Sequence, residues 1–190
     1  PTTGLISGTL NSSASVGGPY TVVITATDPH GAAVTQTFVW TVTNPIPVAQ
    51  DDNFTVNENG TISGNVFANN GNGVDNDPDG DSFSVTAVAG GAGNVGNATA
   101  GSNGGLFTID SNGTLAFDPN GQFDYLALGE SATTAITYII TDADGATSTA
   151  TVSVLVSGSN DDPVTVGVIA NQSGNDSSSV NLDVSSFFTD

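Results

Sequence analysis

The stretch from Thr134 to Val156 reads TAITYIITDADGATSTATVSVLV and decides the fold. Its two halves, Thr134–Thr141 and Thr147–Val156, alternate strictly between apolar and small polar residues. A period of two residues places successive side chains on opposite faces of a β-strand. Each half therefore predicts a strand with one buried face, and the acidic Asp142–Gly145 segment between them predicts the connecting turn.

Strand patterns recur through the rest of residues 45–157. Further strand candidates are Phe54–Val56, Thr61–Phe67, Ser82–Ala89, Leu106–Asp110 and Thr114–Phe117. Gly90–Gly105 is rich in Gly, Ala and Asn, which predicts a long, poorly ordered loop. Phe123–Gly129 predicts a helical turn. About seven strands with turns at this spacing predict one complete β-sandwich.

The composition supports an all-β chain and limits its chemistry. The 190 residues include 24 Gly and neither Cys nor Met. Nineteen acidic residues face no Lys or Arg, and the net charge is -19. This balance excludes nucleic acid and anionic membrane surfaces as electrostatic partners. No apolar run is long enough to cross a bilayer, so membrane insertion is not expected.

Catalysis is not expected either. Without Cys, Lys or Arg, most nucleophilic, Schiff-base and phosphate-handling schemes lack their residues. His30 is the single imidazole and stands between Pro29 and Gly31, where we interpret it as a turn residue rather than a general base. Pairs of carboxylates can hydrolyse glycosides, but here the acidic residues fall on turns without an aromatic cleft. We therefore expect no enzyme.

The run Asp75-Asn76-Asp77-Pro78-Asp79-Gly80-Asp81 interrupts the strand pattern. Four carboxylates this close repel one another, and the chain has no cationic side chain apart from His30 to pair with them. The run matches the first half of an EF-hand loop, but its twelfth position is Thr86 instead of Glu. Oxygen ligands on alternate residues favour Ca²⁺, held by Asp75, Asp77, Asp79 and Asp81. The alternative is a solvated acidic turn.

Residues 1–44 and 158–190 flank the complete domain. In the first, Leu5–Leu10, Tyr20–Thr27 and Thr35–Val42 predict strands, and the alternation of Phe38 with Trp40 predicts core packing. Residues 44–52 form a linker stiffened by two prolines. Residues 158–163 form a second acidic linker.

The terminal segments resemble parts of one repeat type. Residues 1–44 resemble the C-terminal part of a dystroglycan-type cadherin-like repeat, an Ig-like module, through TGLISGT (3–9), YTV (20–22) and TDPHG (27–31). Residues 158–190 resemble the opening of another such repeat through IANQ (169–172), VNLDV (180–184) and FFTD (187–190).

The central segment, residues 45–157, resembles the VCBS-type and cadherin-like repeats of large bacterial adhesins. The resemblance is carried by GSNGG (101–105), FDPNG (117–121), LGE (128–130) and YIITDADG (138–145). Together these resemblances imply an all-β chain of tandem Ig-like or cadherin-like β-sandwiches, one complete and two partial.

In cadherin-like arrays, Ca²⁺ bridges consecutive domains. Carried onto this chain, the resemblance implies a first junction with Asp28, Asp51, Asp52 and Glu58 as ligands. It implies a second junction with Asn160, Asp161 and Asp162, while Asp142 and Asp144 could serve either that junction or the loop at 75–81. Asp190 stands where the last repeat would begin its own acidic loop.

The resemblance also implies a function outside the cell, at a bacterial cell surface. We expect a calcium-stabilised structural module of an adhesin or fibre, acting as a mechanical extender or as the subunit of a self-assembling filament. Its partners would be neighbouring repeats or further copies of itself, head to tail. The alternatives are a carbohydrate-binding or glycan-processing accessory module with glycans as partners, and a surface-layer or sheath protein.

Overall fold

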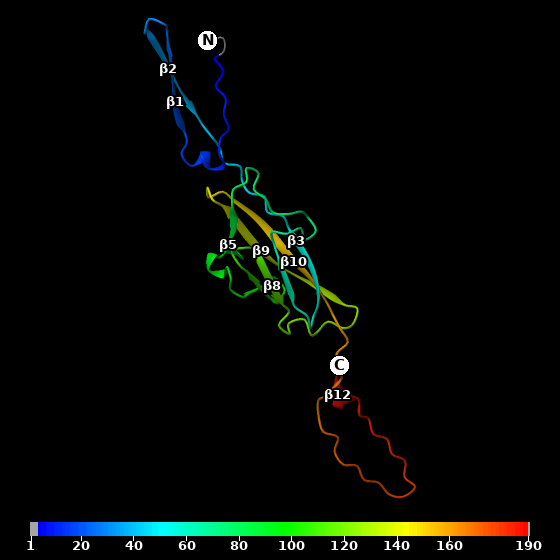
Figure 1. Ribbon diagram of the computed structural model, residues 1–190. Helices are drawn as coiled ribbons and strands as arrows, with labels where there is room; N and C mark the ends of the chain where they lie inside the picture. Colours follow the sequence, from blue (N-terminus) through cyan, green and yellow to red (C-terminus); the bar gives the residue numbers. More distant parts are fainter. Residues whose placement is uncertain (1–3, 190) are drawn as a thin grey trace.

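The computed structural model describes residues 4–189 and shows an elongated molecule in three parts (Figure 1). A β-hairpin stands at one end, a β-sandwich forms the middle, and a long loop extends from the other end. The only helical turns among the described residues are the 3₁₀ segments η1 (Ser12–Ser15), η2 (Ala92–Asn94) and η3 (Ser185–Phe187). None of the helices in residues 4–189 has the length and apolar character to cross a membrane.

The sandwich consists of two four-stranded sheets. One has the order β3-β10-β9-β5 and the other the order β4-β8-β7-β6. Their bounds are β3 (Asp52–Asn57), β4 (Ile62–Asn65), β5 (Phe83–Val88), β6 (Thr99–Ala100), β7 (Leu106–Ile109), β8 (Thr114–Asp118), β9 (Ser131–Asp142) and β10 (Thr147–Ser157). The long strands β9 and β10 pair antiparallel, from Thr141 opposite Thr147 to Ser131 opposite Ser157. The expected all-β, Ig-like sandwich is confirmed.

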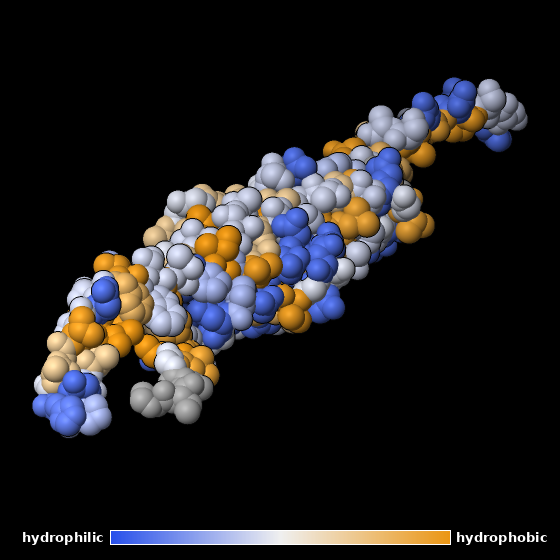
Figure 2. Space-filling view, turned by 90° about the horizontal axis from the view of Figure 1, so that it is seen from above, coloured by the Kyte–Doolittle hydropathy of each residue, from blue (hydrophilic) through white to orange (hydrophobic). Residues whose placement is uncertain are grey.

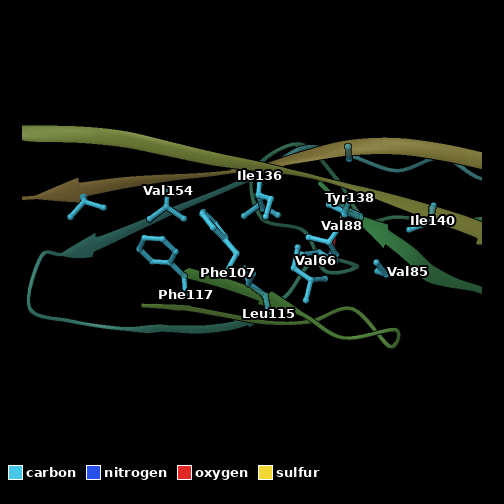
Figure 3. Packing of buried hydrophobic residues seen from close by; sticks show 14 of the residues in the cluster. Val66, Val85, Val88, Phe107, Leu115, Phe117, Ile136, Tyr138, Ile140 and Val154 are labelled. Atoms are coloured by element: carbon cyan, nitrogen blue, oxygen red, sulfur yellow. Dashed lines mark hydrogen bonds between the residues drawn. The ribbon is translucent and has the colours of Figure 1, made fainter. Parts of the chain in front are cut away.

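The alternation in β9 and β10 produces the core. Ile136, Tyr138 and Ile140 of β9 point inward and are buried, as are alternate residues of β10 from Ala150 to Val156. They meet the buried side chains of β7 and β8 between the two sheets (Figure 3). Phe107 and Phe117 pack with ring centroids 4.6 Å apart. The sandwich therefore has a continuous apolar core of its own.

β3 runs parallel to β10, and this sets which residues share an end of the sandwich. Asp52 pairs with Val152, and Asn57 pairs with Ser157. The end of β3 therefore lies beside the end of β10. The turn between β9 and β10 lies at the opposite end, together with the start of β5, because Phe83 pairs with Asp142.

The expectation of a poorly ordered loop at Gly90–Gly105 is wrong. This segment contains η2 and the edge strand β6, which pairs with β7. Its backbone is also bound to itself and to β9: the Gly101 N–H donates to the Gly105 carbonyl (3.0 Å), and the Ser102 N–H donates to the Ala135 carbonyl (2.9 Å). Glycine supplies the tight turns that these contacts need, with φ of +72° at Gly105.

Two smaller expectations also differ from the structure. Residues 4–11 contain no strand, so the strand expected at Leu5–Leu10 is absent. The helical turn expected at 123–129 is present only as hydrogen-bonded turns, such as the Leu126 N–H to Phe123 carbonyl bond (2.9 Å), without a regular helical segment. Within it, Phe123 and Leu126 are buried, while Tyr125 and Leu128 are exposed at the end of the sandwich.

The two terminal parts bury little. At one end β1 (Tyr20–Thr27) and β2 (Ala33–Trp40) form a two-stranded sheet with Tyr20 opposite Trp40. Trp40 and Phe38 are exposed, contrary to the expected core packing. At the other end β11 (Val164–Thr165) and β12 (Phe188–Thr189) pair over two positions.

Candidate cation-binding sites at the two ends of the sandwich

The acidic loop before β5 is folded around the Asp77 carboxylate. Asp77 Oδ1 accepts hydrogen bonds from the backbone N–H groups of Asp79 (3.2 Å) and Asp81 (3.3 Å). Gly80, at φ +85°, allows the chain to turn there. The second oxygens differ: Asp77 Oδ2 and Asp81 Oδ2 are buried and have no hydrogen-bond partner among residues 4–189. Asp81 as a whole is only 9% exposed.

The β9–β10 turn lies beside this loop. Asp142 Oδ1 accepts from the N–H groups of Asp144 (3.0 Å) and Ala146 (2.8 Å), and its Oδ2 accepts from Asn44 Nδ2 (2.8 Å). Burial opposes the charge of Asp142, but these hydrogen bonds outweigh it and lower the pKa of the carboxyl. Asp142 is therefore held ionised.

The hairpin part reaches the same place. Ser15 Oγ donates a hydrogen bond to Asp144 Oδ2. In the linker, Asn44 Oδ1 is buried and has no hydrogen-bond partner among the described residues. Asp79 lines a hollow of about 250 Å³ whose other walls include Asn11 and Ser12. We call this set of oxygen-bearing residues the first-end cluster: Ser15, Asn44, Asp77, Asp79, Asp81, Asp142 and Asp144.

Repulsion within the first-end cluster raises the pKa of Asp79. A side-chain hydrogen bond with Asp77 is the largest cause that raises the pKa of Asp79 to about 6, and the charges of Asp77 and Asp81 add to it. A proton shared between neighbouring carboxyls is how such a group relieves repulsion when no cation is bound. A divalent cation placed among them would relieve it more completely.

A second arrangement lies at the other end of the sandwich. Glu58, directly after β3, is buried, and its Oε1 accepts from the Ser159 N–H (2.6 Å) and the Ser159 Oγ (2.7 Å). Its Oε2 is buried and has no hydrogen-bond partner within residues 4–189. Asn160 and Asp161 follow and line a neighbouring hollow of about 250 Å³. We call Glu58, Ser159, Asn160 and Asp161 the second-end cluster.

Asp52 and Asp75 belong to neither cluster. Both are buried and face the Tyr138 hydroxyl, which lies 3.1 Å from Asp52 Oδ2 and 3.0 Å from Asp75 Oδ2. Burial raises the pKa of Asp52 to about 6, reinforced by the charges of Asp75 and Asp51, despite hydrogen bonds from Asn70 and Tyr138. Burial likewise raises the pKa of Asp75. These two carboxyls form a buried polar centre with Tyr138.

The first junction implied by the resemblance does not assemble as expected. Asp28 lies in the β1–β2 turn, where its Oδ1 accepts from the His30 and Ala32 N–H groups. That turn is at the tip of the hairpin that points away from the sandwich (Figure 1). Asp51 Oδ1 accepts from the Thr151 N–H midway along β10 (2.8 Å), and Glu58 lies at the far end. Because β3 runs along the length of the sandwich, it carries Glu58 away from Asp51 and Asp52 at its start, and none of the three lies near Asp28 at the hairpin tip.

The remaining expected ligands are placed as follows. Asp142 and Asp144 lie with the 75–81 loop and not with the second linker, because β9 ends where β5 begins. Asp162 is exposed in the second linker. The prediction for Asp190 falls outside the described residues. Ser15, Asn44 and Ser159 were not anticipated as ligands; Asn44 had one signal, its place at the start of the proline linker.

The donor set at each end suits a hard cation that is held by oxygen atoms of more than one kind. Among residues 4–189, no three acidic or histidine side chains are placed to hold a metal ion by themselves. The buried unpartnered oxygens, from Asp77, Asp81 and Asn44 at one end and Glu58 at the other, are nevertheless what oxygen-ligated Ca²⁺ would satisfy. The residues fit the ion, provided that amide, hydroxyl or water oxygens complete its shell.

Comparison with known proteins identifies the family. The family described as "Bacterial cadherin-like domain" matches residues 44–158, more than half of the chain. The chain belongs to the bacterial cadherin-like domain family. Residues 1–43 match a second family, described as "Putative Ig domain". No curated relative matches the sequence. Bacterial cadherin-like domains are typically non-enzymatic modules at the cell surface, and cadherin-like domains generally bind Ca²⁺.

One solved structure shows a distant likeness to this cadherin-like chain. It is a nucleoside hydrolase-related hypothetical protein from Saccharophagus degradans that is associated with carbohydrate metabolism. The identity is 17% and the TM-score 0.33, over 60% of this chain and 25% of that chain. A likeness this weak carries no argument about function.

Proposed function

We propose that this bacterial cadherin-like chain is a calcium-stabilised structural module of an extracellular adhesin or fibre, acting as a mechanical extender. The observation that carries the proposal is the set of buried carboxylate oxygens without hydrogen-bond donors, at both ends of the sandwich. An unpaired buried charge costs several kcal/mol, and no Lys or Arg exists to pair with it. A cation bound from solution would neutralise these buried carboxylates.

Calcium is the ion that best fits the available donors. The chain has no Cys, and His30 lies at the hairpin tip, so both clusters offer oxygen atoms alone. Oxygen-only sites with several carboxylates favour Ca²⁺ over softer metals. At the first end Asn44, Asp77 and Asp81 would hold the ion, with Asp142 and Asp144 beside them. At the second end Glu58 would hold it together with Asn160 or Asp161.

Position gives the ion a mechanical role. The first-end cluster draws oxygens from the hairpin part (Ser15), from the linker (Asn44) and from the sandwich (Asp142). A cation bound to all three would stiffen the junction, because bending it would break metal–ligand bonds. The second-end cluster would do the same between Glu58 and the linker that leaves the sandwich. An extender that works at the cell surface needs such stiff junctions.

Thermal unfolding with and without calcium tests the proposal. Extracellular Ca²⁺ modules bind with a Kd of about 10⁻⁴–10⁻³ M. At a calcium concentration 100 times the Kd, binding to the folded state adds about 2.7 kcal/mol. We expect melting temperatures roughly 5–10 °C higher in calcium than in EDTA. Equal melting curves in calcium and EDTA would refute the proposal.

A pair of substitutions localises the site. Asp81→Asn removes one buried unpartnered oxygen charge, so the calcium-dependent rise in melting temperature should shrink markedly. Asp110→Asn removes the same charge from the β7–β8 turn, outside both clusters, and should keep the full rise. Small-angle X-ray scattering then measures the stiffness of the molecule. In the wild type, the distribution of maximum dimensions should be narrower in calcium than in EDTA. In Asp81→Asn, the distributions in calcium and in EDTA should be the same.

A further inference from the structure

The hairpin part presents an apolar sheet face that, within residues 4–189, only the segment 9–14 borders. Tyr20, Val22 and Ile24 of β1 alternate onto one face, and their register partners on β2 include Trp40 and Phe38. Trp40 is 47% exposed and Phe38 41%. A hollow of about 620 Å³ opens over this face, lined by Tyr20, Val22 and Trp40 among others. A two-stranded sheet of this kind is only marginally stable in water.

The opposite end of the molecule carries strand-like segments that are paired only at the base of the loop. Val164, Val166 and Val168 alternate with polar or small residues, and so do Val180, Leu182 and Val184. All six are on the surface; Val168 is 90% exposed. Within the described residues, pairing across this loop is confined to its ends, where Val164 pairs with Thr189, Thr165 pairs with Phe188, and the Val166 N–H donates to the Phe187 carbonyl (2.9 Å). Figure 2 shows hydrophobic side chains on both tapering ends.

The two terminal parts leave the sandwich far from each other. They leave opposite ends of the sandwich (Figure 1), which are separated by the 11 residues of β10. A strand of that length spans roughly 35 Å. The linker 158–163 reaches about 20 Å at most when fully extended. The first apolar segment, Val164–Val168, therefore cannot be laid on the hairpin of its own chain.

We propose that residues 164–189 of a second copy of this chain cover the apolar face of the β1–β2 hairpin. The two parts would fold together into one sandwich built from two chains, joined head to tail. Each part supplies two segments of alternating strands, and together they make the two layers that a stable β-domain needs. This inference goes beyond the proposed function because it names a surface and its partner, and it does not depend on calcium.

Charge favours this contact over others. Two copies, each at -19, repel across most of their surfaces. The strands β1 and β2 contain no charged residue at all, and neither does Val164–Val168. In the second segment Asp183 alternates with Leu182 and Val184, so its carboxylate would face away from the covered side. The apolar faces are thus the places where two such chains can approach closely.

The exposed apolar side chains are concentrated at the two ends of the molecule. Eleven large hydrophobic side chains are exposed among residues 5–40 and eight among residues 164–188, against five in the linker and sandwich between them. Most of the exposed large apolar surface is therefore at the two ends. Aromatic side chains bury roughly 150–250 Å² each, so half-covered Tyr20, Phe38 and Trp40 alone would contribute about 250 Å². Ile24 and Val34 lie on the same face and add to this area, for which a standard interface sets a scale of roughly 800 Å² per partner.

Trp40 reports on the proposed contact directly, because it is the only tryptophan in the chain. The 190-residue protein is diluted in steps while its sedimentation and its tryptophan emission are recorded, in calcium and in EDTA. We expect dimers and longer species at high concentration, with Trp40 emission shifted to shorter wavelength and less quenched by acrylamide. A monomer with unchanged emission up to about millimolar concentration would overturn the proposal. Assembly in EDTA would distinguish its success from that of the calcium proposal.

A substitution in residues 164–189 should change the emission of Trp40 at the other end of the molecule. Leu182→Asp places a charge in the proposed interface and should weaken assembly at least about tenfold, abolishing the emission shift. The matched control, Asn181→Asp, adds the same charge on the opposite face of the same segment and should assemble within about twofold of the wild type. If Leu182→Asp still assembles fully, the contact lies elsewhere and the proposal is wrong.

Mixing two defective chains completes the test. Phe38→Asp spoils the hairpin face and leaves residues 164–189 intact, while Leu182→Asp does the reverse. Each should be monomeric alone. Mixed in equal amounts, they should form a one-to-one complex that grows no further, since only one intact pair of surfaces remains. Failure to form this complex, when the wild type does assemble, would rule out head-to-tail complementation in favour of another mode.

Discussion

Replacing Asp52 by Asn should stabilise the sandwich at neutral pH. Asp52 is buried beside Tyr138 and Asp75, and its pKa is raised from 3.8 to about 6. The new amide keeps both hydrogen bonds: its oxygen can still accept from Asn70, and its NH₂ group can donate to the Tyr138 oxygen. The Tyr138 proton then becomes free for Asp75 Oδ2, 3.0 Å away. No buried polar atom is left unpaired.

The magnitude follows from proton linkage. An acid whose folded-state pKa lies above its unfolded value binds more protons when folded, so the free energy of unfolding falls as pH rises between the two pKa values. For Asp52 the loss starts near pH 4 and is complete somewhat above pH 6. A shift of about two units corresponds to about 3 kcal/mol. Asp52→Asn should gain up to this amount at pH 8 and nothing below about pH 4.

Urea unfolding followed by far-ultraviolet circular dichroism measures the effect. The experiment is run from pH 3.5 to 8 in EDTA, so that calcium does not contribute. Asp110→Asn serves as the control for removing one negative charge, and its stability relative to the wild type should change by no more than about 0.5 kcal/mol. Two results would contradict this reasoning: Asp52→Asn being no more stable than the wild type at pH 8, or its added stability persisting at acidic pH. Either would mean that burying the charged Asp52 carboxylate does not destabilise the folded state.

Further predictions concern packing. Phe117→Ala empties part of the sandwich core and should cost about 3–5 kcal/mol in urea unfolding, whereas Phe38→Ala on the uncovered hairpin face should cost less than about 1 kcal/mol at concentrations where the chain is monomeric. Gly101→Ala would place a Cβ 2.4 Å from Thr134 Oγ1 and 2.6 Å from the Phe107 ring, so overpacking should cost about 1–3 kcal/mol. An unchanged urea midpoint in Gly101→Ala would mean that the β6–β7 connection is looser than described.

Local patterns predicted the secondary structure of the sandwich well, and failed where tertiary contacts decide. The bounds of β1 agree with the predicted range, and β9 and β10 extend theirs by a few residues. The prediction of a poorly ordered loop at 90–105 was wrong, because composition alone does not show that its backbone groups find partners on β9 and β7. The prediction of core packing for Phe38 and Trp40 was wrong for a different reason. Alternation shows that a face is apolar, but not that anything within residues 4–189 covers it.

The candidate sites divide in the same way. The sequence showed that carboxylates cluster at 75–81 and 142–145, and that the chain has no Lys or Arg to neutralise them. It did not show that Asp75 turns inward to Tyr138 while Asp77 and Asp81 remain with the loop. Successive residues in a loop are free to point in different directions, and burial of each one depends on the strands beside it.

Two properties were determined by the sequence itself. The alternation in Thr134–Val156 specifies a half-buried pair of strands, because a period of two is a local property of the extended backbone. The absence of Lys and Arg specifies that internal acidic groups must use hydrogen bonds, protons or ions from solution. Neither property depends on how distant segments are arranged.

Only the tertiary structure decided which acids meet. Glu58 follows β3, and the parallel pairing of β3 with β10 carries it to the end where Ser159 lies. The antiparallel β9–β10 turn carries Asp142 to the other end, beside Asn44. Strands about a hundred residues apart acquire their direction and register from packing of the shared core. That is why the family resemblance, carried over in chain order, placed Glu58 at the wrong end of the sandwich.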